Sequence, residues 1–584
     1  MAKENGKTGR PLILIPCSCV STESNKTGAW RFLRPLYDDK TAPCSVACPA
    51  GEDIGRIEML AARGELKKAW ETILRENPFP GVCGRVCYHP CEKSCNRGEF
   101  DEAVRIHTLE RFIADNAARN HYTPLLERLP RKKQKIALIG AGPAGLAGAY
   151  FLTLLGYSCD VFEALPEPGG VLRWGIPLYR LPLYALRNDI AQIEGQGVRI
   201  HTNRQITRDM MRDLATRYDG IFLGCGHAAS GVPDLPGGDL TSVGSGLHFL
   251  KRIREGEPPP VDGLSVVIGG GNTAVDVARS ITRLGGKALI AYRRRRRDMP
   301  AFEEEVAMLL DEGIELRELL APLEVREDGG GCLLKLARTK VVGTDEGGRG
   351  LVERDGEKTE EIRAERIFTA TGERAAERWY EPPARGTGVS VLNSCVLVNR
   401  PDTAVTVFAG DLTAGIKSVA HAVASAKEAA IALDLFFRSG PDSIDAALKD
   451  CLVGDGPSHS MEIHMKGERH GRNPHIVTFE EINTDYFRLA RAVTQPRLLR
   501  DERLRSFAEI DLKISAGMAI GEAERCFNCG LCNQCDNCYL YCPDMSVVHD
   551  DSARGRHIDY TYCKGCGLCV VECPRNAMRL EEEE

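Results

Sequence analysis

A repeated cysteine pattern near the end of the chain limits its fold more than any other feature. Residues 532–543 and 563–574 both follow the spacing C-x2-C-x2-C-x3-C-P. Bacterial proteins bind [4Fe-4S] clusters with this spacing, and the fourth cysteine of each run ligates the cluster of the other run. The two copies are offset by 31 residues, from Cys532 to Cys563. The sequence therefore predicts a small pseudo-symmetric module that holds two clusters.

The two predicted ligand sets exchange their fourth cysteine. One set is Cys532, Cys535, Cys538 and Cys573, and the other is Cys563, Cys566, Cys569 and Cys542. A zinc site is the alternative, but zinc ribbons use paired C-x-x-C knuckles rather than a doubled run that ends in proline. Cys526 and Cys529 precede the first run and are left over. They are spare thiols, an alternative register or ligands to a further group.

The distribution of the other cysteines favours metal binding in a reducing compartment. Eight of the 23 cysteines precede residue 96, ten follow residue 525 and five are scattered between them. C-x-x-C spacing in a chain of 584 residues favours metal ligation over a disulfide framework. The net charge of -6 argues against general nucleic-acid binding, and no apolar run approaches the roughly 18 residues of a membrane span. We therefore expect a cytoplasmic multidomain protein that binds neither nucleic acid nor membranes.

A first nucleotide-binding pattern follows at residues 135–164, which read KIALIGAGPAGLAGAYFLTLLGYSCDVFEA. A strand, a turn built from Gly140, Gly142 and Gly145, a helix and a second strand follow one another. Glycines in such a turn let a pyrophosphate approach the helix N-terminus closely. Glu163 ends the second strand, where a carboxylate accepts hydrogen bonds from a ribose. The sequence predicts an adenine dinucleotide at this site.

Residues 265–293 repeat the pattern as SVVIGGGNTAVDVARSITRLGGKALIAYR. The turn residues are Gly269, Gly271, Asn272 and Ala274. At the position of Glu163 stands Arg293, the first of five consecutive arginines. Arginine suits a 2′-phosphate because it forms charge-assisted, often bidentate hydrogen bonds. We predict that Arg293 and Arg294 contact the phosphate of NADP(H), and that residues 295–297 form a solvated face.

Two such folds in one chain predict FAD in the first and a nicotinamide nucleotide in the second, because hydride passes between two stacked rings. Residues 405–430 read VTVFAGDLTAGIKSVAHAVASAKEAA. This stretch resembles the motif that closes the flavin site of two-dinucleotide flavoproteins, which implies that Asp411, after Gly410, meets the ribityl chain. The sequence around Gly372 resembles the stretch in which the chain of such flavoproteins crosses back from the nicotinamide domain to the FAD domain. The resemblance implies an FAD domain that the nicotinamide domain interrupts.

The motifs CSVACPAGEDI, NPFPGVCGRVCYHPCEKSC and GGVLRWGIPLYRLP, the last containing Gly170, stand in the first 182 residues. Together these resemble the small-subunit family of glutamate synthase, shared with electron-bifurcating ferredoxin:NADP transhydrogenases, over roughly residues 40–440. The resemblance implies an amino-terminal helical domain with [4Fe-4S] clusters. It gives one complete ligand set: Cys48, Cys87, Cys91 and Cys95.

A second amino-terminal cluster lacks an obvious ligand set. The family uses a C-x-x-C pair shortly before Cys44, where this chain reads RFLRPLYDDKTAPC. Only Cys44 and Cys83 remain nearby, which is too few for a second site. Cys17 and Cys19 could supply the pair from a distance. We therefore predict one amino-terminal cluster.

These motifs divide the chain into domains. We expect an amino-terminal helical iron-sulfur domain over 1–130, an FAD domain over 131–250 and 371–440, an NADPH domain over 251–370, a linker over 441–520 and a ferredoxin module over 521–584. Glycine, serine and proline around the four histidines of the linker favour a solvated segment. The fold class is multidomain α/β, with two Rossmann-like domains between iron-sulfur domains.

The order of these parts predicts electron transfer between NADP(H), FAD and the clusters. Since cofactors perform the redox steps, we expect no catalytic side chain. DYTYCKGCGLCVVECPRNAM also resembles the ferredoxin-type subunit of 2-oxoacid:ferredoxin oxidoreductases. This implies a low-potential partner in a hetero-oligomer: ferredoxin, a 2-oxoacid oxidoreductase or an acyl-CoA reductase. The alternatives are a glutamate synthase small subunit that supplies an amidotransferase and a scaffold without turnover.

Overall fold

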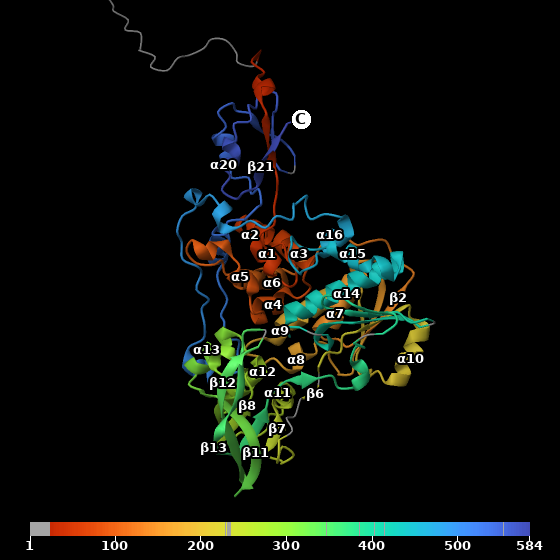
Figure 1. The fold of residues 1–584 in the computed structure, drawn as a ribbon, viewed down its shortest axis with the longest axis vertical. Helices are drawn as coiled ribbons and strands as arrows, with labels where there is room; N and C mark the ends of the chain where they lie inside the picture. The colour runs from red at the N-terminus through yellow and green to blue at the C-terminus, as the bar shows by residue number, and fades with distance from the viewer. Residues whose placement is uncertain are drawn as a thin grey trace, which may run out of the picture.

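The computed structural model describes residues 24–583 except 228, 231–234, 346, 385, 402, 414 and 553. The molecule is elongated (Figure 1). The carboxy-terminal cysteine module lies at one end and the second dinucleotide domain at the other, with the amino-terminal helical domain and the first dinucleotide domain between them. Cys17 and Cys19 lie outside the described residues.

A seven-stranded sheet in the order β16-β17-β18-β5-β2-β3-β4 forms the first dinucleotide domain. Its strands are β2 (Lys135–Ile139), β3 (Ser158–Phe162), β4 (Arg199–His201), β5 (Gly220–Leu223), β16 (Val389–Val391), β17 (Val396–Val398) and β18 (Val405–Phe408). The five from β18 to β4 are parallel, and their apolar residues are buried because helices cover the sheet. Since β18 follows the second domain in sequence, the interrupted arrangement predicted for the first domain is confirmed.

Helices α7 (Pro143–Leu154) and α14 (Val419–Ser439) pack against each other in the core of this domain. Ten of the twelve residues of α7 are buried, which explains its nearly uninterrupted apolar sequence. The remaining helices of the domain are α8 (Val171–Trp174), α9 (Leu183–Gly195) and α10 (Arg208–Arg217).

The second dinucleotide domain is a parallel sheet in the order β10-β9-β8-β14-β7. Its elements are β7 (Val243–Ser245), α11 (Gly246–Arg254), β8 (Leu264–Ile268), α12 (Asn272–Arg283), β9 (Lys287–Tyr292), α13 (Glu303–Asp311), β10 (Glu315–Glu318) and β14 (Arg366–Thr369). An antiparallel sheet of β11 (Leu320–Asp328), β12 (Gly331–Thr344) and β13 (Gly350–Ala364) extends from it. The short strands β6 (Ala229–Ser230) and β15 (Glu373–Arg374) pair where the chain passes between the domains. Because β7 pairs with β14, this domain begins before the expected residue 251.

Six helices form the amino-terminal helical domain. They are α1 (Pro43–Ala47), α2 (Ile54–Ala62), α3 (Leu66–Leu74), α4 (Pro80–Val86), α5 (Pro90–Lys93) and α6 (Ile106–Arg119). Helices α4 and α6 approach so closely that a Cβ on Gly84 would lie 2.5 Å from the backbone nitrogen of Arg111. The helices share one hydrophobic core with the first dinucleotide domain.

The carboxy-terminal cysteine module contains α19 (Asn537–Leu540), β19 (Val547–His549), β20 (Arg556–Ile558), α20 (Leu568–Val571) and β21 (Met578–Glu582). Strand β1 (Leu33–Tyr37) pairs antiparallel with β21, from Leu33 opposite Glu582 to Tyr37 opposite Met578. Arg31 donates hydrogen bonds to the carbonyl oxygens of Tyr560 and Cys563 at 2.7 and 3.1 Å. The amino-terminal helical domain was expected to include residues 1–130. Residues 28–37 instead belong to the carboxy-terminal cysteine module, because they pair with β21 and with residues 560–563.

The segment expected to be a solvated linker is packed instead. It contains α15 (Ile444–Lys449), α16 (Met461–Lys466), α17 (Arg500–Arg503) and α18 (Ala516–Glu524). The buried Glu76 carboxylate of the helical domain pairs with Lys427 and, at 2.8 Å, with Arg469. His459 is buried, and His464 lies 2.8 Å from Asp434. The composition predicted a solvent-exposed segment because the sequence does not show which distant residues pair with these polar side chains.

Candidate cofactor and iron-sulfur sites

The glycine turn after β2 forms a narrow cradle. Gly140 has φ +96°, and a Cβ there would lie 2.6 Å from the Cα of Cys225. A Cβ on Gly145 would lie 1.9 Å from the carbonyl oxygen of Gly140, and one on Gly170 would lie 2.8 Å from the Cα of Gly142. Only glycine fits these positions, and α7 begins directly after Gly142. The cradle has the geometry that a pyrophosphate requires.

Glu163 lies beside this cradle. Its Oε2 accepts a hydrogen bond from the backbone nitrogen of Ala141 at 2.7 Å, and its Oε1 accepts one from Leu165 at 2.9 Å. The carboxylate is therefore bonded to the backbone of the glycine turn itself, where the ribose of a dinucleotide is expected. Its contact with a ribose stays a prediction.

The flavin-closing motif borders a cavity of about 430 Å³ that reaches the amino-terminal helical domain. Gly410 and Asp411 line one side, and Ala47, Pro49 and Tyr88 line another. The backbone nitrogen of Gly410 donates to Ser425 Oγ at 2.8 Å, which fixes the turn. Burial raises the pKa of Asp411, although Lys417 and His227 oppose the shift. Because these wall residues are sequence neighbours of Cys48 and Cys87, the cavity joins the expected flavin position to the amino-terminal thiols.

The second glycine turn has a similar restriction. Gly269 has φ +149°, and a Cβ there would lie 2.3 Å from the carbonyl oxygen of Ala370. Helix α12 begins at Asn272, whose Oδ1 accepts a hydrogen bond from Phe302 at 3.0 Å. Gly271 precedes the helix, and Ala274 is buried beneath it. Gly372 follows β14 with φ +123° and open space around it.

The arginines divide between two environments. Arg293 is exposed after β9, and Arg294 lies 3.8 Å from Asp345. Since β9 pairs in parallel with β8, both arginines lie near the glycine turn that follows β8. Of residues 295–297, expected to be a solvated face, Arg296 and Arg297 are exposed, and Arg295 pairs with Asp298 at 2.7 Å. All three border a cavity of about 1200 Å³ that Cys87 and Tyr88 also line. The phosphate contacts of Arg293 and Arg294 stay predictions.

Sequence reasoning did not find a cluster of three side chains on the wall of this larger cavity. His89, Glu92 and His107 offer ligand atoms within 4.8 Å of one another. The rings of His89 and His107 stack at 3.8 Å, and His107 Nδ1 lies 2.7 Å from Glu92 Oε1. Burial, together with the charge of His107, lowers the pKa of His89 to about 3. The three could hold a metal ion, although their sequence spacing gave no such signal.

The amino-terminal thiols form two groups, and neither is the set expected from the sequence. Cys48, Cys83, Cys87 and Cys91 form the first group: burial, and then nearby charge that includes Cys87, raises the pKa of Cys48, Cys83 and Cys91. Cys95, which was expected in this set, lies with Cys44 instead. The physical reason is that the chain after α5 turns toward α18, where the side chain of Asn96 contacts Cys529. Cys83 therefore takes the place of Cys95 in this group.

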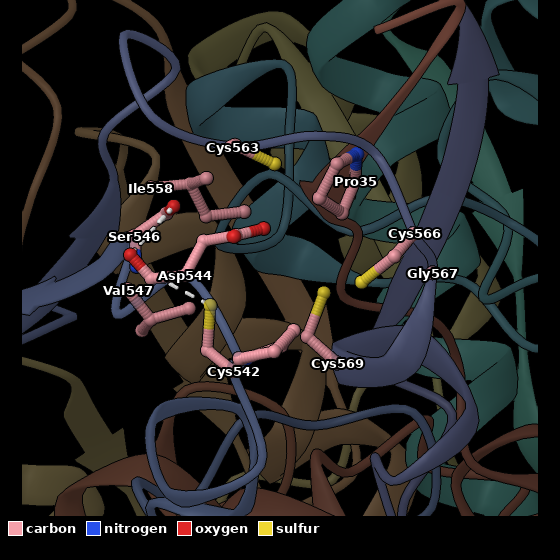
Figure 2. Close-up of a pocket in the computed structure, with 11 residues that line it drawn as sticks. Pro35, Cys542, Asp544, Ser546, Val547, Ile558, Cys563, Cys566, Gly567 and Cys569 are labelled. Carbon is pink, nitrogen blue, oxygen red and sulfur yellow. Dashed lines mark hydrogen bonds between the residues drawn. The ribbon is translucent and has the colours of Figure 1, made fainter. Parts of the chain in front are cut away.

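The carboxy-terminal thiols lie in the two groups that the sequence predicts. Cys542, Cys563, Cys566 and Cys569 face one small cavity, with Pro35 of β1 at its rim (Figure 2). Cys532, Cys535, Cys538 and Cys573 line another. The backbone nitrogens of Ser546 and Ala577 donate to Cys542 Sγ at 3.2 Å and Cys573 Sγ at 3.3 Å, each four residues further along the chain. This repeated contact reflects the pseudo-symmetry, while cluster ligation by these thiols stays a prediction.

The buried thiols have the chemistry that a cluster requires. Burial raises the pKa of Cys87 and Cys569 to about 12, so both are protonated at neutral pH without a metal. Iron ions would favour the thiolates over the thiols and offset the cost of burying negative charge. Among the described residues every cysteine is free of disulfides, so all these sulfurs are available as ligands.

These sites define a flavin- and iron-sulfur-dependent nicotinamide oxidoreductase. One glycine cradle lies beside a buried carboxylate, a second lies beside arginines, and the flanking domains carry the thiol groups. Three family models match in the same order. Residues 21–122 match dihydropyrimidine dehydrogenase domain II, 4Fe-4S cluster; residues 134–426 match pyridine nucleotide-disulphide oxidoreductase; and residues 556–579 match a 4Fe-4S binding domain. The chain belongs to the pyridine nucleotide-disulphide oxidoreductase family, and it carries iron-sulfur domains at both ends. The predicted fold class and the cofactors FAD, NADP(H) and [4Fe-4S] are thereby confirmed.

Three curated relatives illustrate the range of the family. The NADPH-Fe(3+) oxidoreductase subunit beta of Geobacter sulfurreducens is 38% identical over 300 residues, 50% of this chain and 45% of that protein. The NADP(+)-dependent formate dehydrogenase subunit beta of Moorella thermoacetica is 32% identical over 527 residues, 84% of this chain and 70% of that protein. The glutamate synthase [NADPH] small chain of Escherichia coli K12 is 35% identical over 323 residues, 52% of this chain and 68% of that protein. The last match confirms the predicted family resemblance, and the chain spans about half the length of the Geobacter relative.

Among the described residues, no helix is long and apolar enough to cross a membrane.

Proposed function

We propose that this chain is the NADP(H)-coupling subunit of a larger oxidoreductase and exchanges electrons with a ferredoxin-type carrier or with a partner enzyme that contains a low-potential centre. A 2-oxoacid oxidoreductase and an acyl-CoA reductase are the two partner enzymes that the sequence favours. When bound, FAD would take up one hydride from the nicotinamide and release its two electrons singly. The chain itself supplies binding, orientation and exclusion of water.

The observation that carries this proposal is the shared wall of the cavity at Asp411. Tyr88 and Pro49, which are sequence neighbours of Cys87 and Cys48, line the same cavity as Gly410 and Asp411 of the flavin-closing motif. The expected positions of nicotinamide, flavin and thiols therefore follow one another from the second dinucleotide domain to the carboxy-terminal module (Figure 1).

The surface of the carboxy-terminal module supports an exchange with a partner. Large apolar side chains are exposed there, among them Leu540 (70% exposed), Met545 (74%) and Val571 (68%). Cys566 is also exposed, so a cluster at this thiol would lie close to the surface. A surface that combines an accessible redox centre with apolar side chains suits a protein partner.

Anaerobic purification from the native host, with mass-spectrometric identification of co-eluting chains, tests the partner class. We expect subunits of a 2-oxoacid oxidoreductase or acyl-CoA reductase, or a ferredoxin. Formate dehydrogenase subunits would extend the role of the Moorella relative to this chain and would replace the partner proposed here. A large amidotransferase subunit that turns over glutamine and 2-oxoglutarate would establish the glutamate synthase alternative, which the 35% identical small chain supports.

A variant of the apolar surface tests where the electron carrier docks. Replacing Leu540 and Val571 by aspartate should slow electron transfer to the carrier at least tenfold while NADPH still reduces the flavin at the wild-type rate. Val391, which is 62% exposed on β16 of another domain, offers a matched control as Val391→Asp. Unchanged transfer in the double variant would place the partner on another face.

A further inference from the structure

Cys526 and Cys529, left over from the ferredoxin pattern, lie in the amino-terminal helical domain. Cys44, Cys95, Cys526 and Cys529 pack in the same hydrophobic core, and Asn96, which follows Cys95, donates through Nδ2 to Cys529 Sγ at 3.5 Å. Burial raises the pKa of the Cys44 thiol, and nearby charge on Cys95, Cys526 and Cys529 adds to that shift. Cys44 and Cys529 are 7% and 8% exposed, and the other two are half-buried. Four thiols thus converge in one interior site from three separate stretches of sequence.

We propose that Cys44, Cys95, Cys526 and Cys529 are the ligands of a second [4Fe-4S] cluster in the amino-terminal helical domain. The C-x-x-C pair that is missing before Cys44 is thereby supplied from the far end of the chain. The proposal concerns cluster binding, so it does not depend on the partner or on the direction of electron flow.

Backbone contacts fix the distal pair in the helical domain. Asn528 Nδ2 donates to the carbonyl oxygen of Gly55 at 2.9 Å, and Arg97 Nη1 donates to that of Arg525 at 2.8 Å. The backbone nitrogen of Lys40 donates to the carbonyl oxygen of Gly530 at 2.7 Å. These three bonds hold the pair on both sides. The backbone nitrogen of Gly530 also donates to the carbonyl oxygen of Arg575 at 2.6 Å, so the same segment contacts the carboxy-terminal module as well.

Hydrophobic packing holds the same segment. Helix α18, which leads into Cys526, packs against α2 and α6. Its residues Ala519 and Ala523 are buried in the core that also contains Cys44 and Ile57. The approach is close, because a Cβ on Gly55 would lie 3.0 Å from Leu531 Cδ1. Residues 516–531 are therefore an integral part of the amino-terminal helical domain.

Nitrogen donors point at the sulfurs, as they do in the carboxy-terminal module. The backbone nitrogen of Asn528 lies 3.3 Å from Cys526 Sγ, and Asn96 Nδ2 lies 3.5 Å from Cys529 Sγ. Hydrogen bonds to sulfur stabilise thiolate ligands and tune the potential of iron-sulfur clusters. A set of four uncrosslinked thiols, two buried and two half-buried, with such donors fits a cluster better than it fits a purely apolar core.

The proposed cluster fills a gap between the other sites. Cys91 of the first thiol group interacts electrostatically with Cys44. On the other side, Cys529 and Cys532 are three residues apart, which a chain spans in at most about 11 Å. The backbone nitrogen of Cys532 also donates to Asp39 Oδ1 at 3.2 Å. The site thus connects the helical domain to the carboxy-terminal module and gives electrons a continuous series of thiol sites.

Iron and acid-labile sulfide, counted in the anaerobically purified full-length chain, test the proposal. The variant with Cys526→Ser and Cys529→Ser should lose about four iron and four sulfide per chain relative to the wild type. The buried Cys395 and Cys451 stand outside all four thiol groups, and the variant with Cys395→Ser and Cys451→Ser should keep the full iron content. Wild-type iron content in the Cys526/Cys529 variant, or zinc in place of iron in the native protein, would overturn the proposal.

Alkylation of the wild-type chain keeps the test decisive if the variant does not fold. With iron bound, the half-buried Cys95 and Cys526 should resist iodoacetamide, and after removal of iron by a chelator both should react. Cys395 and Cys451 should stay equally unreactive in both states, because only burial protects them. Labelling of Cys526 and Cys529 in fully iron-loaded protein would refute the assignment.

Discussion

Asn528 donates through Nδ2 to the carbonyl oxygen of Gly55 at 2.9 Å, a buried bond between residues 473 positions apart in the sequence. The same residue donates its backbone N–H toward Cys526 Sγ at 3.3 Å and has φ +50°, in the left-handed region that asparagine tolerates better than most residues. Asn528 therefore links the backbone of α2 to a thiol of the distal C-x-x-C pair.

Replacing Asn528 by alanine should loosen the distal pair. The carbonyl of Gly55 would lose its buried partner, which costs about 1–3 kcal/mol. We expect a chelator to remove about four iron per chain several-fold faster than from the wild type, as followed by absorbance under anaerobic conditions. The exposed Asn120, whose side chain bonds only within its own helix end, serves as the control. Equal release from N528A and the wild type would contradict the role given to Asn528.

The reduction potential of the proposed cluster should respond to Asn96. Its Nδ2 lies 3.5 Å from Cys529 Sγ. A hydrogen bond to sulfur stabilises the more negative reduced state, so Asn96→Leu should lower the potential. A net bond of about 1 kcal/mol corresponds to roughly 40 mV in a one-electron couple. Redox titration monitored by electron paramagnetic resonance measures the shift, and an unchanged set of potentials would mean that no cluster binds Cys529.

Replacing Arg293 and Arg294 by alanine should weaken NADPH binding and leave NADH binding nearly unchanged. Each charge-assisted hydrogen bond contributes about 1.5–3 kcal/mol, so we expect about 10- to 100-fold weaker NADPH binding per arginine that contacts the phosphate. Fluorescence titration with both nucleotides measures the difference. The exposed Arg326, paired with Glu324 on β11, provides a control arginine in the same domain. Equal losses for both nucleotides would refute the 2′-phosphate assignment. Residues 295–297 would then be the next candidates for the phosphate contact.

Replacing Cys563 by serine should remove a carboxy-terminal cluster while NADPH reduces the flavin as before. The thiol lies in the module at the far end of the molecule from the second dinucleotide domain (Figure 1). Stopped-flow absorbance follows flavin reduction, and iron analysis follows the cluster. If flavin reduction also stopped while the chain remained folded, electrons would not flow from the flavin toward this module.

Asp189 should make the stability of the contact between α4 and α9 depend on pH. Burial raises the pKa of its carboxyl to about 7, although the backbone nitrogens of Gly81 and Val82 donate to it and oppose the shift. Between about pH 4 and pH 7 the folded chain retains a proton that the unfolded chain has lost. This residue's contribution to the free energy of unfolding therefore falls as pH rises through that window, by up to about 1.4 kcal/mol per pH unit.

The Asp189→Asn variant should lack this slope, because asparagine does not titrate. Thermal unfolding midpoints at pH 5, 6 and 7, measured without oxygen, compare the two chains. We expect N189 protein to gain stability relative to the wild type as the pH rises from 5 to 7. A difference that is constant across this range would show that Asp189 is ionised throughout.

Short-range spacing allowed much of the site to be predicted from the sequence. Gly140 and Gly145 stand at positions where a Cβ would collide with backbone atoms. Because only glycine fits there, the residue types by themselves predict the turn. The doubled cysteine run likewise grouped Cys542 with Cys563, because a pseudo-symmetric module leaves few ways to arrange its thiols.

The tertiary structure decided which distant stretches meet. Cys526 looks like an extra member of the ferredoxin run, yet α18 buries its segment against α2 and places it beside Cys44. Strand β1 precedes the helical domain in sequence but pairs with β21 of the module. Local spacing determines glycine turns and cysteine runs because their geometry spans a few residues. The grouping of thiols from opposite ends of the chain depends on domain packing, a sum of many weak contacts that the spacing within any one stretch does not record.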